Sequence, residues 1–329
     1  MSRIHIIIYN IICVCVCIGV MVEAYGRRFL IVGDIVFGVL MGKIIESEDG
    51  YRWYVERQDH MLPLRPDERW LIMILRDLAE NNMILVDVGA HVGKYCIRLA
   101  GYYKHVYAIE PNPISRKILL RNLKLNFISN VTVLPYACGK KKTTMTLYDR
   151  GGSSTMLKEY ASKKSFKIEV RRLDELVNVA HVIKIDVEGL EYDVIQGAQK
   201  LIDNCKPILL IEHHERRGYK KLENLREKII KTLKGYVYIE LDDSHNIYFP
   251  ENYDFFKNLD KVWRVFVTFW VHYMFKMTLE RGCWYYGLPS SWWHGCNQLE
   301  TILELIENFK NIALEDEAWI KNAIKKCGG

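Results

Sequence analysis

Residues 83–95 read MILVDVGAHVGKY, and residues 106–113 read VYAIEPNP. The first run opens with continuous aliphatic residues, which is typical of a strand buried on both faces. It ends in Asp87 followed by two glycines four positions apart, and the second run ends in Glu110. A strand, a glycine-containing turn, a helix and a second strand that ends in an acid make a βαβ unit of the nucleotide-binding kind.

The spacing of the glycines indicates which ligand this unit binds. A dinucleotide site needs the pattern G-x-G-x-x-G, whose amides face a pyrophosphate. Here only Gly89 and Gly93 are present, and Asp87 would repel a pyrophosphate. A carboxylate at that position suits a cationic group, and Glu110 can accept two hydrogen bonds from ribose hydroxyls. S-adenosylmethionine is a ligand that contains both a ribose and a cationic sulfonium. A plain βα turn and a dinucleotide oxidoreductase are the alternatives.

The composition places the chain among ordinary globular proteins. It has 329 residues, of which 50% are hydrophobic, which suits one α/β domain with additions or two domains. The net charge of +6 is too small to argue for nucleic acid as a partner. Nine scattered cysteines form no CxxC pair and no zinc spacing, so we expect a reducing compartment, the cytoplasm.

Residues 1–25 form an apolar segment, and positions 4–22 carry no charge. That length just reaches the ~20 residues that a membrane-spanning helix needs. The two arginines that follow favour a body on the cytoplasmic side. One interpretation is therefore an N-terminal anchor that would associate the protein with a membrane. The other is a core segment, or an extension upstream of a start at Met21.

Residues 26–82 are predicted to lead into the main sheet. A turn at 49–50 introduces an alternating strand over 51–55. Two prolines then precede a helical pattern over 67–80, whose apolar residues share one face. These pieces are expected to pack on the edge of the sheet.

From Met83 to residue 250 strands and helices alternate, which predicts a doubly wound, mostly parallel sheet. Strands are predicted at 83–88, 105–110, 131–138, 182–188 and 207–211, helices at 93–101, 114–126, 190–203 and 220–234, and a closing antiparallel pair at 235–241 and 246–249. Alternating residues at 143–148 and 166–170, joined through a turn at 151–154, predict a β-rich insertion after the third strand. Residues 251–329 are rich in aromatics and predict helices, which would cover one end of the sheet, form a substrate-side lid or face a membrane.

Strand four carries a row of charged side chains. Lys184, Asp186 and Glu188 alternate and are therefore expected on one face of the sheet. Burying three ionisable groups is costly unless they are paired or functional. We predict that all three are catalytic, with His213 at the end of the neighbouring strand as a further candidate base. A purely structural pair between Lys184 and Asp186 is the alternative, and the two roles are compatible.

The run Glu212-His213-His214-Glu215 also suggests a metal site. It lacks the HExxH spacing, and adjacent histidines on a strand point to opposite faces. A polar strand end or the wall of a pocket is the preferred interpretation, so no metal ligand is predicted.

With these residues placed, the chain resembles the FkbM family of S-adenosylmethionine-dependent methyltransferases from about 83 to 215, and more loosely to 250. The residues that carry the resemblance are VDVGAHVG at 86–93, AIEPNP at 108–113, RN at 121–122 with Asn126, PYACG at 135–139, RLDEL at 172–176, IKIDVEGLE at 183–191 and GA at 197–198. The resemblance implies a Rossmann-like class I methyltransferase fold, with a seven-stranded sheet whose last strand is antiparallel.

The resemblance also implies functional residues. Those expected to bind S-adenosylmethionine are Asp87, Gly89, Ala90, His91, Gly93, Glu110, Asn112 and Ala137. The run 184–191 would line the reaction centre. His91 departs from the family, which commonly has asparagine there; an imidazole still donates a hydrogen bond.

Members of this family are similar to O-methyltransferases that act on hydroxyls of sugars and natural products. The prediction is therefore methyl transfer to a glycan or small-molecule hydroxyl. The alternative is a non-catalytic, membrane-associated binding or scaffold protein that retains the fold. Intact carboxylates at the cofactor site argue against the alternative.

Overall fold

The computed structural model describes residues 42–65, 68–157, 162, 164–214, 224–242, 244–253 and 261. The chain divides into two compact units, 1–64 and 65–329. The predicted segment 1–25 lies outside the described residues, as does nearly all of 251–329. Within the described residues, no helix combines the length and the apolar character needed to cross a bilayer. The predicted domain start at Met83 stays a prediction; the second compact unit already begins at Arg65.

The described part of the first unit is a hairpin followed by a 3-10 helix. Strands β1 (Lys43–Glu46) and β2 (Arg52–Val55) pair antiparallel, and η1 (Gln58–Leu64) follows them. The turn between the strands includes Gly50, whose positive φ of 81° suits glycine. The predicted strand at 51–55 and its turn are confirmed.

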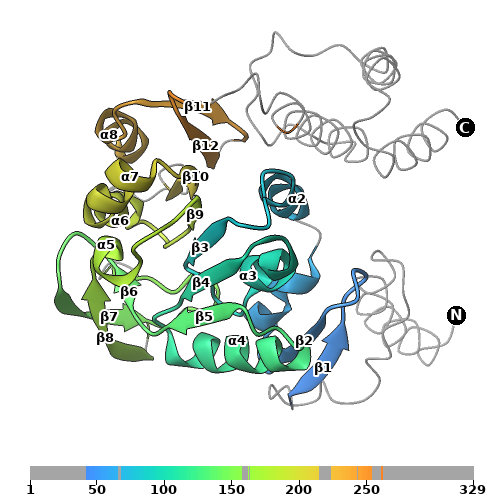
Figure 1. Cartoon of the computed structure of the whole chain (residues 1–329). Helices are drawn as coiled ribbons and strands as arrows, with labels where there is room; N and C mark the ends of the chain where they lie inside the picture. Colours follow the sequence, from blue (N-terminus) through green and yellow to red (C-terminus); the bar gives the residue numbers. More distant parts are fainter. Residues whose placement is uncertain are drawn as a thin grey trace, which may run out of the picture. The chain divides into compact units, whose positions relative to one another are not determined.

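The second unit is built on a seven-stranded sheet in the order β11-β12-β10-β9-β3-β4-β5 (Figure 1). Its strands are β3 (Ile84–Val88), β4 (His105–Ile109), β5 (Val131–Leu134), β9 (Val182–Ile185), β10 (Ile208–Glu212), β11 (Tyr236–Glu240) and β12 (His245–Pro250). Strands β5, β4, β3, β9 and β10 pair in parallel, while β12 runs antiparallel to both of its neighbours. The predicted fold class is therefore confirmed. The winding reverses between β3 and β9, the place where such sheets bind ligands.

Helices cover the sheet on its two faces. The helices are α2 (Arg69–Asp77), α3 (Lys94–Leu99), α4 (Pro113–Leu125), α5 (Leu173–Leu176), α6 (Glu191–Gly197), α7 (Gln199–Cys205) and α8 (Leu225–Thr232), with a 3-10 turn, η2 (Ala100–Tyr102). One core joins Val86, Ile183 and Leu209 of the central strands to apolar residues of α5, α6, α7 and α8. Side chains alternate along a strand, so Asp87 and Lys184 face away from this core.

The predicted third strand over 131–138 is wrong as a single strand. Strand β5 ends at Leu134, and β6 (Ala137–Cys138) belongs to a separate sheet with the order β6-β8-β7. Pro135 lies at the break, where its missing N–H and fixed φ end a strand. The other strands of this sheet, β7 (Thr143–Tyr148) and β8 (Ser165–Arg171), confirm the predicted β-rich insertion.

Two further elements differ from their predicted extent. Strand β9 ends at Ile185, so the alternation expected to continue to residue 188 is wrong; Glu188 instead has a left-handed φ of 55°. The helix predicted over 190–203 is two helices, α6 and α7, separated at Ala198. Gly197 at the end of α6 packs so closely that an added Cβ would lie 2.0 Å from the carbonyl oxygen of Gly139. The structure describes residues 224–234 of the helix predicted over 220–234, and these residues contain α8.

Candidate active site

The carboxyl ends of β3, β4, β9 and β10 meet at one edge of the sheet, and the antiparallel β12 begins there. The acidic side chains that follow β4 and β9, Glu110 and Asp186, and Glu212 at the end of β10 lie here. Parallel strands aligned in this way bring carboxylates distant in sequence to one place.

The glycine turn after β3 lies against the end of β9. The backbone N–H groups of Gly89 and Ala90 both donate to the carbonyl oxygen of Ile109, at 3.0 and 3.1 Å. Gly89 has a φ of 86°, and a Cβ there would lie 1.8 Å from the backbone oxygen of Asp186. The absent side chain therefore allows the two strand ends to approach each other. Gly93, with a φ of 100°, precedes α3.

We expect Gly89→Ala to destabilise the protein and weaken ligand binding at this edge, because a Cβ collides with backbone and the positive φ adds strain of roughly 1–3 kcal/mol. Thermal denaturation of the variant should show a lowered Tm. Gly101→Ala is the matched control, since no atom lies within 4 Å of the added Cβ. Equal melting temperatures for the two variants would contradict the close approach.

Glu110 is held by the backbone of two neighbouring turns. Its Oε2 accepts from His91 N at 2.7 Å and its Oε1 from Asn112 N at 2.7 Å. The left-handed φ of His91, 49°, belongs to the turn that presents this N–H. Burial raises the pKa of Glu110, and His91 and the backbone N–H of Asn112 oppose that rise. Each oxygen of a carboxylate has two lone pairs, so both retain one for hydroxyl donors.

Asn112 connects this turn to the β-rich insertion. Its Oδ1 accepts from Ile114 N at 2.9 Å and caps α4. Its Nδ2 donates to Asp149 Oδ1 at 3.1 Å and Ser154 Oγ at 3.3 Å. The fully buried Thr155 in turn donates from Oγ1 to the backbone oxygen of Glu188 at 3.0 Å. The loop between β7 and β8 therefore lies against the predicted cofactor residues, and the sequence did not reveal these contacts.

Ala137 lies in β6 and is buried in the small core of the insertion, with Leu147, Ile168 and Val170. Its role in binding the cofactor stays a prediction.

Lys184 joins two carboxylates. Its Nζ lies 3.5 Å from Asp87 Oδ1 and 3.2 Å from Asp186 Oδ2, and 4.7 Å from the centroid of the Tyr95 ring. Asp87 also accepts from Cys96 N at 3.2 Å. Burial alone would lower the pKa of Lys184, but Asp186 and Asp87 outweigh it and raise the pKa above its usual value. Burial raises the pKa of Asp87, and Lys184 opposes this. The lysine therefore stays charged between them.

Four carboxylates surround the imidazole of His214, and they come from the segment after β9, the start of α6 and the end of β10. Its Nδ1 lies 2.7 Å from Glu191 Oε1, and its Nε2 lies 3.2 Å from Glu188 Oε2 and 3.8 Å from both Asp186 Oδ1 and Glu212 Oε1. Burial alone would lower the pKa of His214, but Glu188 and Glu191 outweigh it and raise the pKa to about 11. The imidazole is cationic at neutral pH unless another cation replaces its proton.

His213 is not brought to this group. Its Nε2 lies 3.1 Å from the hydroxyl of Tyr248 on β12, and its ring packs edge-on against the tyrosine. Its catalytic role stays a prediction. His214 was the histidine that sequence reasoning missed, although a signal was present: Lys184 pairs with Leu210, and residues 210, 212 and 214 share one side of an extended chain.

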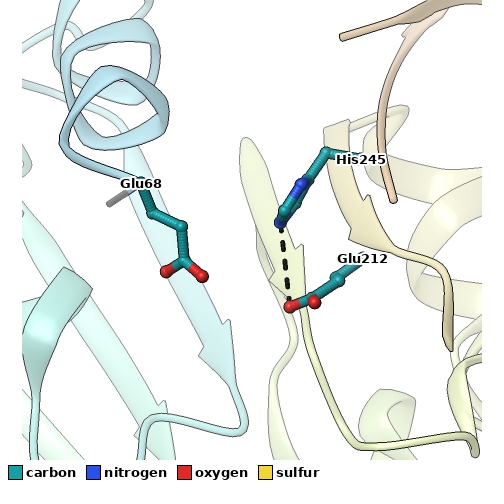
Figure 2. Close-up of side chains that lie close together, drawn as sticks. All are labelled: Glu68, Glu212 and His245. Atoms are coloured by element: carbon teal, nitrogen blue, oxygen red, sulfur yellow. Dashed lines mark ion pairs between the residues drawn. The ribbon is translucent and has the colours of Figure 1, made fainter. Parts of the chain in front are cut away.

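Glu212 also faces a second histidine. His245 Nε2 lies 3.7 Å from Glu212 Oε2, and His245 Nδ1 lies 3.0 Å from both carboxylate oxygens of Asp242. Figure 2 shows Glu68, from the turn before α2, with its carboxylate directed toward Glu212 and His245. Glu68, Glu212 and His245 offer ligand atoms within 4.8 Å of one another, as do Asp186, Glu212 and His214. Neither Glu68 nor His245 is among the residues predicted from the sequence.

The segment that contains this site is similar in sequence to known methyltransferases. Residues 87–240 match the methyltransferase FkbM domain. Hexuronic acid methyltransferase AglP of Haloferax volcanii is 24% identical over 186 residues, which are 54% of this chain and 77% of that protein. Methyltransferase 1 of Beauveria bassiana is 26% identical over 157 residues, which are 38% of this chain and 63% of that protein.

Among solved structures, a methyltransferase FkbM from Methylobacillus flagellatus KT aligns with 25% identity and a TM-score of 0.38. The alignment covers 51% of this chain and 43% of that one. The matched segment 87–240 contains the glycine turn, Glu110 and the ends of β9 and β10. Residues 87–240 of this chain therefore match the methyltransferase FkbM domain, and the chain is a methyltransferase.

Proposed function

We propose that this protein transfers a methyl group from S-adenosylmethionine to a hydroxyl of a glycan or a natural-product-like small molecule. The observation that carries the proposal is the arrangement at the switch point. Asp87 precedes the glycine turn, Glu110 accepts from the N–H of His91 in that turn, and Asp186 follows the neighbouring β9.

The residues present fit the donor. Glu110 keeps acceptor capacity for the two ribose hydroxyls, and the absent side chain of Gly89 lets the end of β9 approach the glycine turn. Asp87 supplies negative charge toward a cationic amino-acid end, with Lys184 shared between it and Asp186. The donor, when bound, supplies an electrophilic methyl group on a sulfonium and leaves as a neutral thioether, so no acid is needed for the leaving group.

The acceptor hydroxyl must lose a proton as its oxygen bonds to the methyl carbon. Asp186 is the suited base at this edge: its side chain is 27% exposed, whereas Glu188, Glu191 and Glu212 are each 10% exposed or less. Lys184 fixes Asp186 Oδ2, and its Oδ1 lies toward His214. The proton passes to Asp186 while the methyl–sulfur bond breaks, and the chain otherwise acts by holding the two reactants in line.

A sugar acceptor is favoured by one relative. AglP of Haloferax volcanii is described as a hexuronic acid methyltransferase, and this chain spans 77% of it. The described residues Asp149 and Ser154 of the insertion loop lie against Asn112, where they add polar groups beside the donor site. We therefore place hexuronic acids, free or within a glycan, first among the acceptors to test.

Glu110→Gln is expected to weaken binding of S-adenosylhomocysteine by about 10-fold or more, because a hydrogen bond to a charged group is worth roughly 1.5–3 kcal/mol. Isothermal titration of the purified full chain measures the Kd. The control is Glu251→Gln, an exposed carboxylate just after β12, at the opposite edge of the sheet. A folded wild-type protein that binds neither S-adenosylmethionine nor S-adenosylhomocysteine at millimolar concentration would refute the proposed function.

A further inference from the structure

We propose that Glu68, Glu212 and His245 form a binding site for a divalent metal ion of the Mn²⁺ or Zn²⁺ class. The three ligand atoms lie within 4.8 Å of one another and come from three separate segments: the turn before α2, the end of β10 and the start of β12 (Figure 2). The side chains of Glu212 and His245 are buried, while that of Glu68 is partly exposed.

The first support is the orientation of His245. Both oxygens of Asp242 lie 3.0 Å from its Nδ1. A carboxylate accepts hydrogen bonds, so Nδ1 carries the proton and Nε2 is the nitrogen that faces Glu212. Metal-binding histidines are held in the same way, with the second ring nitrogen donating to a carboxylate that fixes the ring and raises its basicity. Asp242 is thus a positioning residue for the proposed ligand.

The second support is the spacing between His245 and Glu212. Their nearest atoms, Nε2 and Oε2, are 3.7 Å apart, which is too long for a direct hydrogen bond. Two ligands of one ion with bonds of about 2.1 Å lie roughly 3 Å apart when adjacent and roughly 4.2 Å apart when opposite. The observed separation falls between these limits.

The third support is how Glu68 is held. Lys94 Nζ donates to its Oε2 at 3.0 Å, and the hydroxyl of Tyr95 donates to the same oxygen at 3.2 Å. Both bonds fix the carboxylate through Oε2, so Oε1 keeps its full acceptor capacity for an ion. The exposure of this side chain, 29%, leaves a path for water or a substrate oxygen to complete the coordination.

The ligand set indicates the class of ion. One imidazole and two carboxylates suit Mn²⁺ or Zn²⁺, whereas Mg²⁺ and Ca²⁺ prefer oxygen ligands only. Glu212 also faces His214, which in turn lies 3.8 Å from Asp186. An ion at this place would hold an acceptor oxygen beside the proposed base. That role rests on the proposed function, whereas ion binding itself does not.

The test is titration of the chelator-treated full chain with Mn²⁺, followed by electron paramagnetic resonance of free Mn²⁺, without donor or acceptor. We expect one Mn²⁺ per chain, displaced by Zn²⁺. His245→Gln should remove binding, and Asp242→Asn should weaken it by about 10–100-fold. His105→Gln is the matched control, because this histidine begins β4 at the opposite end of the sheet, where its Nε2 lies 2.9 Å from Thr132 Oγ1. Should His245→Gln fail to fold, judged by circular dichroism, Glu68→Gln replaces it.

Absence of stoichiometric Mn²⁺ and Zn²⁺ binding would overturn the proposal; a proton on His245 would then balance the neighbouring carboxylates. Binding that survives His245→Gln but is lost in His214→Gln would also overturn it, since the ion would then belong to Asp186, Glu212 and His214. The binding of S-adenosylhomocysteine, measured on the same samples, separates a failed metal site from a failed methyltransferase assignment.

Discussion

Lys184→Met is expected to lower the free energy of unfolding by about 3–5 kcal/mol, the usual cost of removing one partner of a buried ion pair. The substitution keeps an unbranched side chain of similar length but leaves Asp87 fully buried beside Asp186 without its cation. Urea unfolding measures the loss as a lower midpoint at unchanged slope.

The exposed pair Lys231–Glu227 supplies the control for this prediction. Its side chains are 71% and 59% exposed, so Lys231→Met should change stability by no more than about 0.5 kcal/mol. Adding Asp87→Asn to Lys184→Met should restore part of the stability, because the uncompensated charge is then gone. A loss below 1 kcal/mol for Lys184→Met, or no recovery in the double variant, would show that the lysine does not hold Asp87 ionised.

The sheet was predictable because its signals are local. The aliphatic runs at β3, β9 and β10 are buried on both faces, and the acids that end β3 and β4 mark the switch point whatever surrounds them. The errors have local causes too. The predicted third strand runs through Pro135, where β5 has already ended, and the predicted alternation of strand four runs past Ile185 into a backbone that turns left-handed at Glu188.

The site was predictable only in part, because its other half is assembled by tertiary contacts. Sequence position gives Asp87, Glu110, Lys184 and Asp186 together, since all four follow or end parallel strands. It predicts an antiparallel strand at 246–249, but it gives no sign that this strand begins at His245 and is inserted beside β10, which brings the ring to Glu212. Glu68 lies outside the strands altogether, in the turn before α2. Residues contributed by flanking elements carry no periodic or motif signal of their own.

Asp186→Asn is expected to reduce kcat by about 10²–10⁴-fold, the usual contribution of a positioned general base, while leaving the Kd for S-adenosylhomocysteine within about 2-fold. Asparagine keeps the shape of the side chain and can still accept from Lys184, but it cannot take the proton of the acceptor hydroxyl. The assay transfers a labelled methyl group to free hexuronic acids, a neutral hexose and glycans that contain them, and kcat is compared on whichever acceptor the wild-type chain methylates.

Asp203→Asn is the control for this last prediction, because Asp203 lies on α7 with 67% of its side chain exposed and pairs with Lys206 on the surface. Its kcat should match the wild type. A loss of S-adenosylhomocysteine affinity that parallels the loss of kcat in Asp186→Asn would mean that Asp186 holds the donor rather than the acceptor's proton. In that case Glu188 becomes the next candidate base to test, since its carboxylate lies at the same strand end, 3.2 Å from His214 Nε2.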